Sequence, residues 1–209
     1  IPTTGGRAVL IDCGANAECT PEYLVQFAYL GSFYAQQVLG LERPRVGLLN
    51  IGAEDSKGTD LQKQTLARLK EADAAGHLHF IGNIEAKEAI KGGCDVIVTD
   101  GFSGNILLKT MEGVGSFAGS ALKSMFKKNL LTKLAALAVM PGLNAFKDKL
   151  DPNKVGGTAF IGISKAVIKA HGASNAEAIE NAVGQAAAFA RSGLIEKIEE
   201  NVNLMKIEQ

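Results

Sequence analysis

One short stretch joins a buried strand, a glycine-rich turn and the start of a helix, and it limits the folds open to this chain. The β-branched run Val96–Val98 predicts a buried strand that ends abruptly. Gly101–Gly104 predicts a tight turn, and Ile106–Leu108 the beginning of a helix. In an open α/β sheet, ligands bind where strands end and helices begin, and free N–H groups at a helix N-terminus favour an anion. A phosphate or reacting carbonyl is therefore expected beside Asp100, Ser103 and Asn105.

The same order of strand, loop and helix repeats along the chain. Further strands are predicted at Arg7–Ile11, Arg45–Ile51 and His79–Ile81. Each is followed by a helix signal, over residues 21–40, 61–74 and 85–90. Beyond Gly156, apolar runs and a closing alanine-rich helix resume the pattern. Such alternation predicts an α/β fold with a mainly parallel sheet and helices on both faces.

Composition excludes several classes of protein. A chain of 209 residues that is 46% hydrophobic can bury a core, as one large domain or two small ones. Its 22 basic residues balance 22 acidic ones, so no nucleic-acid partner is predicted. Three cysteines without metal-ligand spacing suit a reducing cytosol, and no metal site is predicted. The first residues show no signal pattern and no Met, which suggests processing or a fragment.

A basic segment interrupts the alternation. Between residues 123 and 149 six lysines stand against one acid, a surplus of about five charges. The apolar run Leu130–Met140 has a helical period, with a break expected near Asn129 and an end at Pro141–Gly142. A second helix over about 143–150 would return beside it. We therefore predict a protruding amphipathic helical hairpin over residues 121–150.

Several motifs in this order resemble one family, the bacterial phosphate acyltransferases of phospholipid synthesis (the PlsX family, acyl-ACP:phosphate transacylases). The resemblance is carried by Asp12–Asn16 with Thr20–Glu22, Gly47–Gly58, Gly82–Asn83, Thr99–Thr110 and Ala170–Gly172. It implies a three-layer α/β/α fold like that of isocitrate and isopropylmalate dehydrogenases and of phosphate acetyltransferases. It also implies a homodimer without a metal or nucleotide cofactor.

The reaction implied by the resemblance is fatty acyl-ACP plus inorganic phosphate, giving acyl phosphate for a downstream glycerol-3-phosphate acyltransferase. The family's chain starts well before Ile1. Residues 1–209 are accordingly expected to form one α/β unit, the C-terminal part of a longer chain, and to be inactive alone. The implied location is the cytoplasm, with peripheral attachment to the membrane.

The chemistry needs few groups, because phosphate is already an anionic nucleophile. A site must hold phosphate near the thioester carbon and stabilise an oxyanion. Lys57, in a glycine-flanked loop after a strand, is the candidate cation, with a solvated loop lysine as the alternative. Asp60 could orient phosphate or accept a proton, or simply begin the next helix. Asn105 is the third predicted catalytic residue, through hydrogen bonds to carbonyl or phosphate.

The remaining candidates are predicted to bind substrate, each with a structural alternative. Ser103 and its neighbours are also common turn residues, Asp100 could instead fix the loop by accepting N–H bonds, and His171 could be a structural histidine. The predicted substrate-binding set is Asp12, Asn16, Glu54, Asp100, Gly101, Ser103, Gly104 and His171.

The predicted hairpin is compatible with three roles. It could pack on the dimer partner, it could dock the acidic acyl-ACP through its lysines, or it could enter the lipid interface. For contact with lipid, the predicted membrane contacts are Leu134, Leu137, Ala138 and Val139.

Two other functions of the chain compete with acyl transfer from acyl-ACP: a phosphate acetyl- or butyryltransferase that uses a CoA thioester and needs no such hairpin, and a non-catalytic fragment. A nicotinamide dehydrogenase is disfavoured, because no G-x-G-x-x-G follows a strand.

Overall fold

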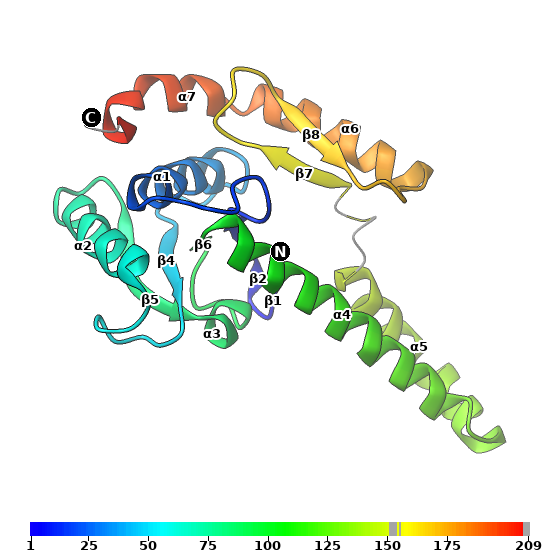
Figure 1. Ribbon diagram of the computed structural model, residues 1–209. Helices are drawn as coiled ribbons and strands as arrows, with labels where there is room; N and C mark the ends of the chain where they lie inside the picture. Colours follow the sequence, from blue (N-terminus) through cyan, green and yellow to red (C-terminus); the bar gives the residue numbers. More distant parts are fainter. Residues whose placement is uncertain (151–153, 155, 207–209) are drawn as a thin grey trace.

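The centre of the molecule is a four-stranded parallel sheet with strand order β3–β6–β4–β5 (Figure 1). The computed structural model describes residues 1–150, 154 and 156–206. The four strands are β3 (Val9–Ile11), β4 (Arg45–Asn50), β5 (His79–Glu85) and β6 (Val96–Val98). The predicted α/β fold with a mainly parallel sheet flanked by helices is confirmed.

Helices cover the two faces of this sheet unequally. On one face α1 (Pro21–Gln37) and α2 (Asp60–Ala74) bury a large cluster that includes Val96 and Val98. On the other face the short α3 (Ala86–Ile90) and the N-terminal residues cover a smaller cluster around Ile97. Because successive side chains of a strand point to opposite faces, one apolar run supplies both cores.

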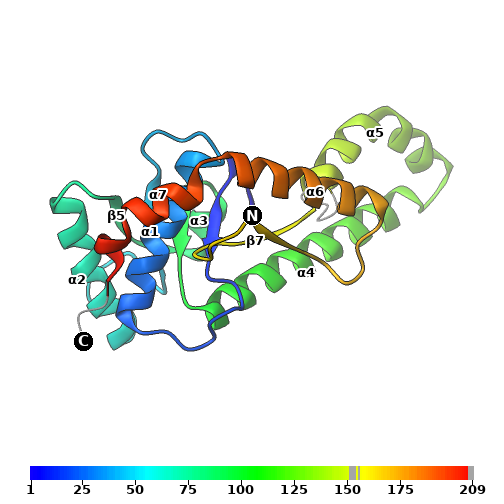
Figure 2. The same ribbon diagram turned by 90° about the horizontal axis from the view of Figure 1, so that it is seen from above.

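Two small antiparallel sheets flank the parallel one. Near the N-terminus β1 (Pro2–Thr3) pairs with β2 (Gly6–Arg7). Towards the C-terminus β7 (Gly157–Phe160) pairs with β8 (Val167–Ala170), and α6 (Ala176–Arg191) packs on both. The chain then returns over α1 through α7 (Leu194–Glu200) and the 3-10 helix η2 (Val202–Met205), as Figure 2 shows.

Two predicted strands have different bounds in the structure. The strand expected over Arg7–Ile11 is divided between β2 and β3, which belong to different sheets. The strand expected to end at Ile81 continues to Glu85. Gly82 has a φ of 93° and lies where the register between β4 and β5 shifts, so the glycine marks a bulge within the strand rather than its end.

A helical hairpin projects away from the sheet, as α4 (Gly101–Phe126) and α5 (Leu130–Leu150) (Figure 1). It turns at residues 127–129 rather than at Pro141–Gly142, so the separate helix expected over about 143–150 is instead the last part of α5. The break expected near Asn129 is confirmed. Asn129 and Thr132 cap α5 reciprocally: the Thr132 amide donates to Asn129 Oδ1 at 2.9 Å, and the Asn129 amide donates to Thr132 Oγ1 at 3.0 Å. The first arm differs from the prediction. The segment that follows β6 and the first arm of the hairpin form one continuous helix, α4, which we did not predict.

The prediction that Pro141 ends a helix is wrong, because α5 continues through it. Proline removes one hydrogen bond within a helix and costs about 3 kcal/mol, which bends a helix without always ending it. The side chains of Lys147 and Lys149, counted in the basic segment, lie outside the described residues.

An ion pair joins two strands at the amino end of the sheet and makes stability depend on pH. Arg45 donates through Nη2 to Asp95 Oδ1 at 2.9 Å and through Nε to Oδ2 at 3.0 Å. These bonds hold the pKa of the Asp95 carboxyl below its usual value.

Asp95→Asn is expected to lower the free energy of unfolding by about 1–2 kcal/mol at pH 7. Because the folded pKa is depressed, the wild-type advantage should be complete above the ordinary aspartate pKa of about 4 and vanish as pH falls through the folded value. Urea titrations of both proteins at pH 7 and pH 3 test this. An unchanged difference at pH 3 would contradict it.

Candidate active site

Three loops that carry predicted site residues leave neighbouring strands at the carboxyl edge of the parallel sheet. One follows β3 and begins at Asp12, one follows β6 and enters α4, and one follows β4 and runs to Thr59. Since β3, β6 and β4 are adjacent, the sheet order brings these loops to one edge. This is the place where ligands bind in open α/β sheets.

The loop after β3 is built around the Asp12 carboxylate, which is buried. Its Oδ1 accepts from the amides of Gly14 at 3.1 Å, Ala15 at 3.2 Å and Cys13. Its Oδ2 accepts from the amide and the side chain of Asn16 at 2.5 and 3.1 Å. Because its acceptors are satisfied by donors of its own loop, Asp12 shapes this loop in the manner of an Asx turn. A direct contact of Asp12 or Asn16 with substrate stays a prediction.

The helix α4 begins at Gly101, five residues earlier than Ile106–Leu108 suggested. Asp100 caps the helix by accepting from the Ser103 amide at 2.7 Å, so the alternative role of fixing the loop is present. The predicted tight turn at Gly101–Gly104 is instead the first turn of the helix.

Two glycines let this first turn lie against the loop after β3. A Cβ on Gly104 would lie 1.9 Å from the Asp12 carbonyl oxygen, and one on Gly101 would lie 2.5 Å from the Asn16 carbonyl oxygen. Only residues without a side chain fit so close to another backbone.

The expectation of free amides for an anion at this helix start needs correction. The Gly101 amide donates to the Asn16 carbonyl at 2.8 Å, Ser103 to Asp100 Oδ1, and Gly104 to the Asp100 carbonyl at 3.0 Å. These donors are already used inside the protein: the loop after β3 supplies the acceptor for Gly101, and the N-cap Asp100 supplies those for Ser103 and Gly104. An anion at this edge therefore depends on side chains more than on these amides.

Asn105 lies on the outer surface of the first turn of α4, next to the loop after β3. Its side chain is exposed, and a Cβ on Gly14 would lie 3.8 Å from Asn105 Cγ. The Asn105 amide is thus placed at the edge and open to a ligand. The half-buried Ser103 lies two residues before Asn105 in the same helix.

The loop after β4 presents Lys57 and Glu54 together. The Lys57 amide donates to the Glu54 carbonyl at 3.1 Å, and a Cβ on Gly52 would lie 2.8 Å from both Lys57 Cγ and Glu54 Oε2. Both side chains therefore lie close to the Cα of Gly52, and both residues are exposed. Among the described residues Lys57 has no ion-pair partner. Lys57 is therefore a cation available to an anion in solution.

Asp60 occupies the first position of α2, directly after the N-cap Thr59. An acid in the first turn stabilises a helix, which is the structural alternative considered for it. Its side chain is exposed, so a role towards phosphate stays a prediction.

His171 belongs to none of these three loops, since it follows β8 and lies in the turn before α6. Its Nδ1 accepts from the Ala173 amide at 3.2 Å, and its carbonyl from the Ser174 amide at 3.0 Å. These bonds shape the turn before α6, and no other predicted site residue shares that turn.

Two asparagines that sequence reasoning left without a role hold the Lys57 loop. Asn83 Nδ2 donates to the Glu54 carbonyl at 3.0 Å, and Asn50 Nδ2 donates to the Lys57 carbonyl at 3.2 Å. Both lie towards the carboxyl ends of strands β5 and β4. The sequence signal that could have revealed them is a polar amide side chain within an otherwise apolar strand.

Cysteine chemistry is disfavoured at this edge. Burial and the nearby Asp12 carboxylate raise the pKa of the Cys13 thiol. Burial also raises the pKa of the Cys19 thiol, which lies in the same loop. Neutral thiols are poor nucleophiles, so neither is suited to attack a thioester at neutral pH.

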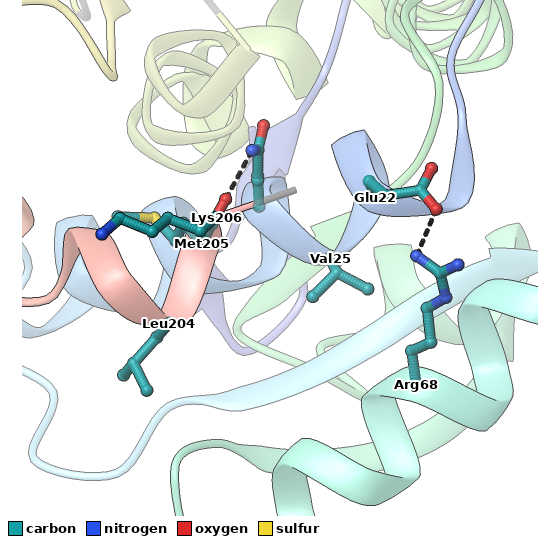
Figure 3. Close-up of a pocket in the computed structure, with 7 residues that line it drawn as sticks. Glu22, Val25, Arg68, Leu204, Met205 and Lys206 are labelled. Carbon is teal, nitrogen blue, oxygen red and sulfur yellow. Dashed lines mark hydrogen bonds and ion pairs between the residues drawn. The ribbon is translucent and has the colours of Figure 1, made fainter. Parts of the chain in front are cut away.

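A small cavity lies elsewhere, between α1, α2 and η2 (Figure 3). Its volume is about 60 Å³, room for a few water molecules. Within it Glu22 pairs with Arg68, and bonds from Thr20, its own backbone and Arg68 lower the Glu22 pKa to about 2. Its lining residues are Glu22, Val25, Gln26, Arg68, Leu204, Met205 and Lys206, which include none of the predicted site residues.

Comparison with known proteins identifies the family. The model of the family described as "Fatty acid synthesis protein" matches residues 1–197. The chain belongs to this family. Members similar to it include proteins named phosphate acyltransferase from Alkaliphilus oremlandii, Brevibacillus brevis and Thermoanaerobacter pseudethanolicus.

These three relatives of the fatty acid synthesis protein family are 48%, 46% and 45% identical to the chain over 202, 203 and 205 residues. The matches cover 97% or 98% of this chain but 59% or 60% of the relatives. The chain therefore spans about three fifths of their length. The family resemblance inferred from the motifs is confirmed.

Proposed function

We propose that this chain is the part of a phosphate acyltransferase that carries Lys57 and Asn105, and that the enzyme transfers a fatty acyl group from acyl-ACP to inorganic phosphate. The proposal rests chiefly on Lys57, a cation without an ion-pair partner among the described residues, held on a tight turn at the sheet edge in a chain similar to phosphate acyltransferases. A cation held in place beside the substrates stabilises phosphate and the developing oxyanion.

In the proposed reaction an oxygen of hydrogen phosphate attacks the thioester carbon. A C–O bond forms, the C–S bond breaks, and the sulfur leaves with its electron pair. The phosphate proton passes to that sulfur, giving acyl phosphate and the free thiol of the carrier. Lys57 binds the phosphate, and Asn105 donates a hydrogen bond to the thioester oxygen as charge grows there. Ser103, Asp60 and Glu54 complete the polar edge, and no nucleophilic side chain is needed.

The test compares two acyl donors and supplies the N-terminal portion that the relatives have in addition. The chain is assayed alone and with the N-terminal portion of the Alkaliphilus oremlandii relative, offering acyl-ACP or acyl-CoA with phosphate. Acyl phosphate formed from acyl-ACP at least about tenfold faster than from acyl-CoA supports the proposal, since tenfold is 1.4 kcal/mol of transition-state discrimination. Preference for a short acyl-CoA favours the phosphate acetyl- or butyryltransferase alternative. No product from either preparation favours a non-catalytic fragment.

The hairpin is proposed to attach the enzyme to the membrane at its tip and to contact a second copy at its base. Apolar side chains are exposed along α5, with Leu134 57% and Leu137 67% accessible. Lys127, Lys128 and Lys133 are exposed beside them at the tip. Apolar side chains beside lysines suit an anionic lipid interface. The described helices contain none long and apolar enough to span a bilayer.

Leu137→Glu with Ala138→Glu is expected to abolish binding to vesicles of anionic lipid, because it removes apolar contact and adds negative charge. Co-sedimentation with vesicles measures the bound fraction, and unfolding temperature should stay unchanged because both side chains are exposed. Glu196→Gln and Glu199→Gln on α7 serve as a control away from the hairpin. Unchanged vesicle binding of the double variant would reject the lipid contact.

A membrane-bound, dimeric enzyme in the cytoplasm would deliver acyl phosphate to the glycerol-3-phosphate acyltransferase at the membrane. A long-chain acyl phosphate is poorly soluble, so release at the lipid surface suits its use by a membrane enzyme. The lysines of the hairpin would also attract the acidic carrier protein.

A further inference from the structure

We propose that Asn83 is a positioning residue, which holds the turn that carries Lys57 and so sets the affinity for phosphate. The inference rests on the proposed function of Lys57 as the phosphate-binding cation. Asn83 lies on β5 and is only 9% exposed. It reaches the turn without facing solvent.

A continuous set of hydrogen bonds leads from Asn83 to Lys57. Asn83 Nδ2 donates to the Glu54 carbonyl oxygen at 3.0 Å. The same oxygen accepts from the Lys57 amide at 3.1 Å. One carbonyl therefore joins the interior of the sheet to the backbone of the lysine.

The orientation of the Asn83 amide is fixed by this acceptor. Exchanging its oxygen and nitrogen would set two oxygens against each other at the Glu54 carbonyl, which is unfavourable. In the observed orientation Asn83 Oδ1 is buried and has no hydrogen-bond partner among the described residues. A buried acceptor without a partner costs stability. The amide thus holds the turn at the expense of an unsatisfied oxygen.

The other end of the turn is held as well, so the Lys57 backbone has little freedom. Asn50 Nδ2 donates to the Lys57 carbonyl at 3.2 Å. Gly58, with a φ of 89°, packs against the same asparagine, because a Cβ there would lie 2.7 Å from Asn50 Oδ1. Fixing the backbone that carries a charged side chain reduces part of the ordering cost when the ligand arrives.

The test is a double-mutant cycle between Asn83→Ala and Lys57→Ala, read as the dissociation constant of inorganic phosphate by calorimetry and as KM for phosphate. Asn83→Ala alone should weaken phosphate binding about tenfold, the usual effect of losing one hydrogen bond that orients a charged group. In the Lys57→Ala background, Asn83→Ala should change the dissociation constant of phosphate less than about twofold, because Asn83 acts through the lysine. The KM should rise more than kcat falls.

Two further variants separate positioning from folding. Asn83→Leu removes the unsatisfied oxygen, so its unfolding temperature should equal or exceed that of Asn83→Ala while phosphate affinity stays low. Asn201→Ala is a matched control, since Asn201 Nδ2 also donates to a backbone carbonyl, that of Lys197 at 2.8 Å on α7. It should leave phosphate affinity unchanged.

Each outcome decides the inference. Equal effects of Asn83→Ala in both backgrounds, or full phosphate affinity in Asn83→Leu, would overturn it while leaving the proposed function intact if acyl phosphate still forms. Coupling to Lys57 without any acyl phosphate would support the positioning role and reject the proposed reaction. Wild-type protein that binds no phosphate would reject both.

Discussion

Lys57→Ala is expected to lower phosphate-dependent acyl transfer about 100- to 1000-fold, the usual cost of removing one group that stabilises a developing oxyanion. The lysine side chain is exposed and has no ion-pair partner in the described part of the chain, so its removal leaves no buried charge. The unfolding temperature should therefore stay the same. The measurement is kcat/KM for phosphate beside a thermal melt.

Lys63→Ala is the matched control, because Lys63 is also exposed and lies on the helix that follows the loop. It should leave kcat/KM for phosphate within about twofold, since an exposed lysine without a partner contributes little. Equal loss in the two variants would mean that general positive charge matters. Full activity of Lys57→Ala would remove Lys57 from the site.

Gly104→Ala is expected to have the largest effect on folding. The new Cβ would lie 1.9 Å from the carbonyl oxygen of Asp12 and 2.8 Å from Cγ2 of Thr99. A backbone atom cannot move aside cheaply, so α4 must shift away from the loop after β3. A loss of about 3–5 kcal/mol is expected, at the upper end for a single overpacked site.

Gly113→Ala on the same helix is the control for Gly104→Ala. Nothing lies within 4 Å of a Cβ built there, so alanine should stabilise the helix by about 0.5–1 kcal/mol. Urea unfolding of both variants gives the two free energies. A loss smaller than about 1 kcal/mol in Gly104→Ala would show that α4 does not need its close approach to Asp12.

The sequence predicted the sheet and the edge where the site residues gather, because both follow from local patterns. The run Val96–Val98 is buried on both faces, as its unbroken apolar character indicates. Asp12 and Asp100 follow strands that proved to be adjacent, which placed their loops together. These relations depend on strand order, and the alternation of strands and helices limits that order strongly.

What the sequence could not supply depends on contacts between distant residues. The early start of α4 rests on Asn16, whose carbonyl accepts the Gly101 amide, and no local pattern announces that bond. The continuation of α5 through Pro141 could not be predicted either, because a proline in a helical pattern usually marks a break. The bond from Asn83 to Glu54 joins residues of different strand–loop units, and becomes visible only when β4 and β5 are paired.

The most direct test of the account is the fate of isotopically labelled inorganic phosphate in the reaction with acyl-ACP. The protein, completed with the N-terminal portion of a relative if needed, is incubated with both substrates, and the products are separated by mass. The account predicts acyl phosphate that retains the label in every oxygen derived from phosphate, and loss of this product in Lys57→Ala. Free fatty acid without labelled acyl phosphate would contradict it, because water rather than phosphate would then be the acceptor.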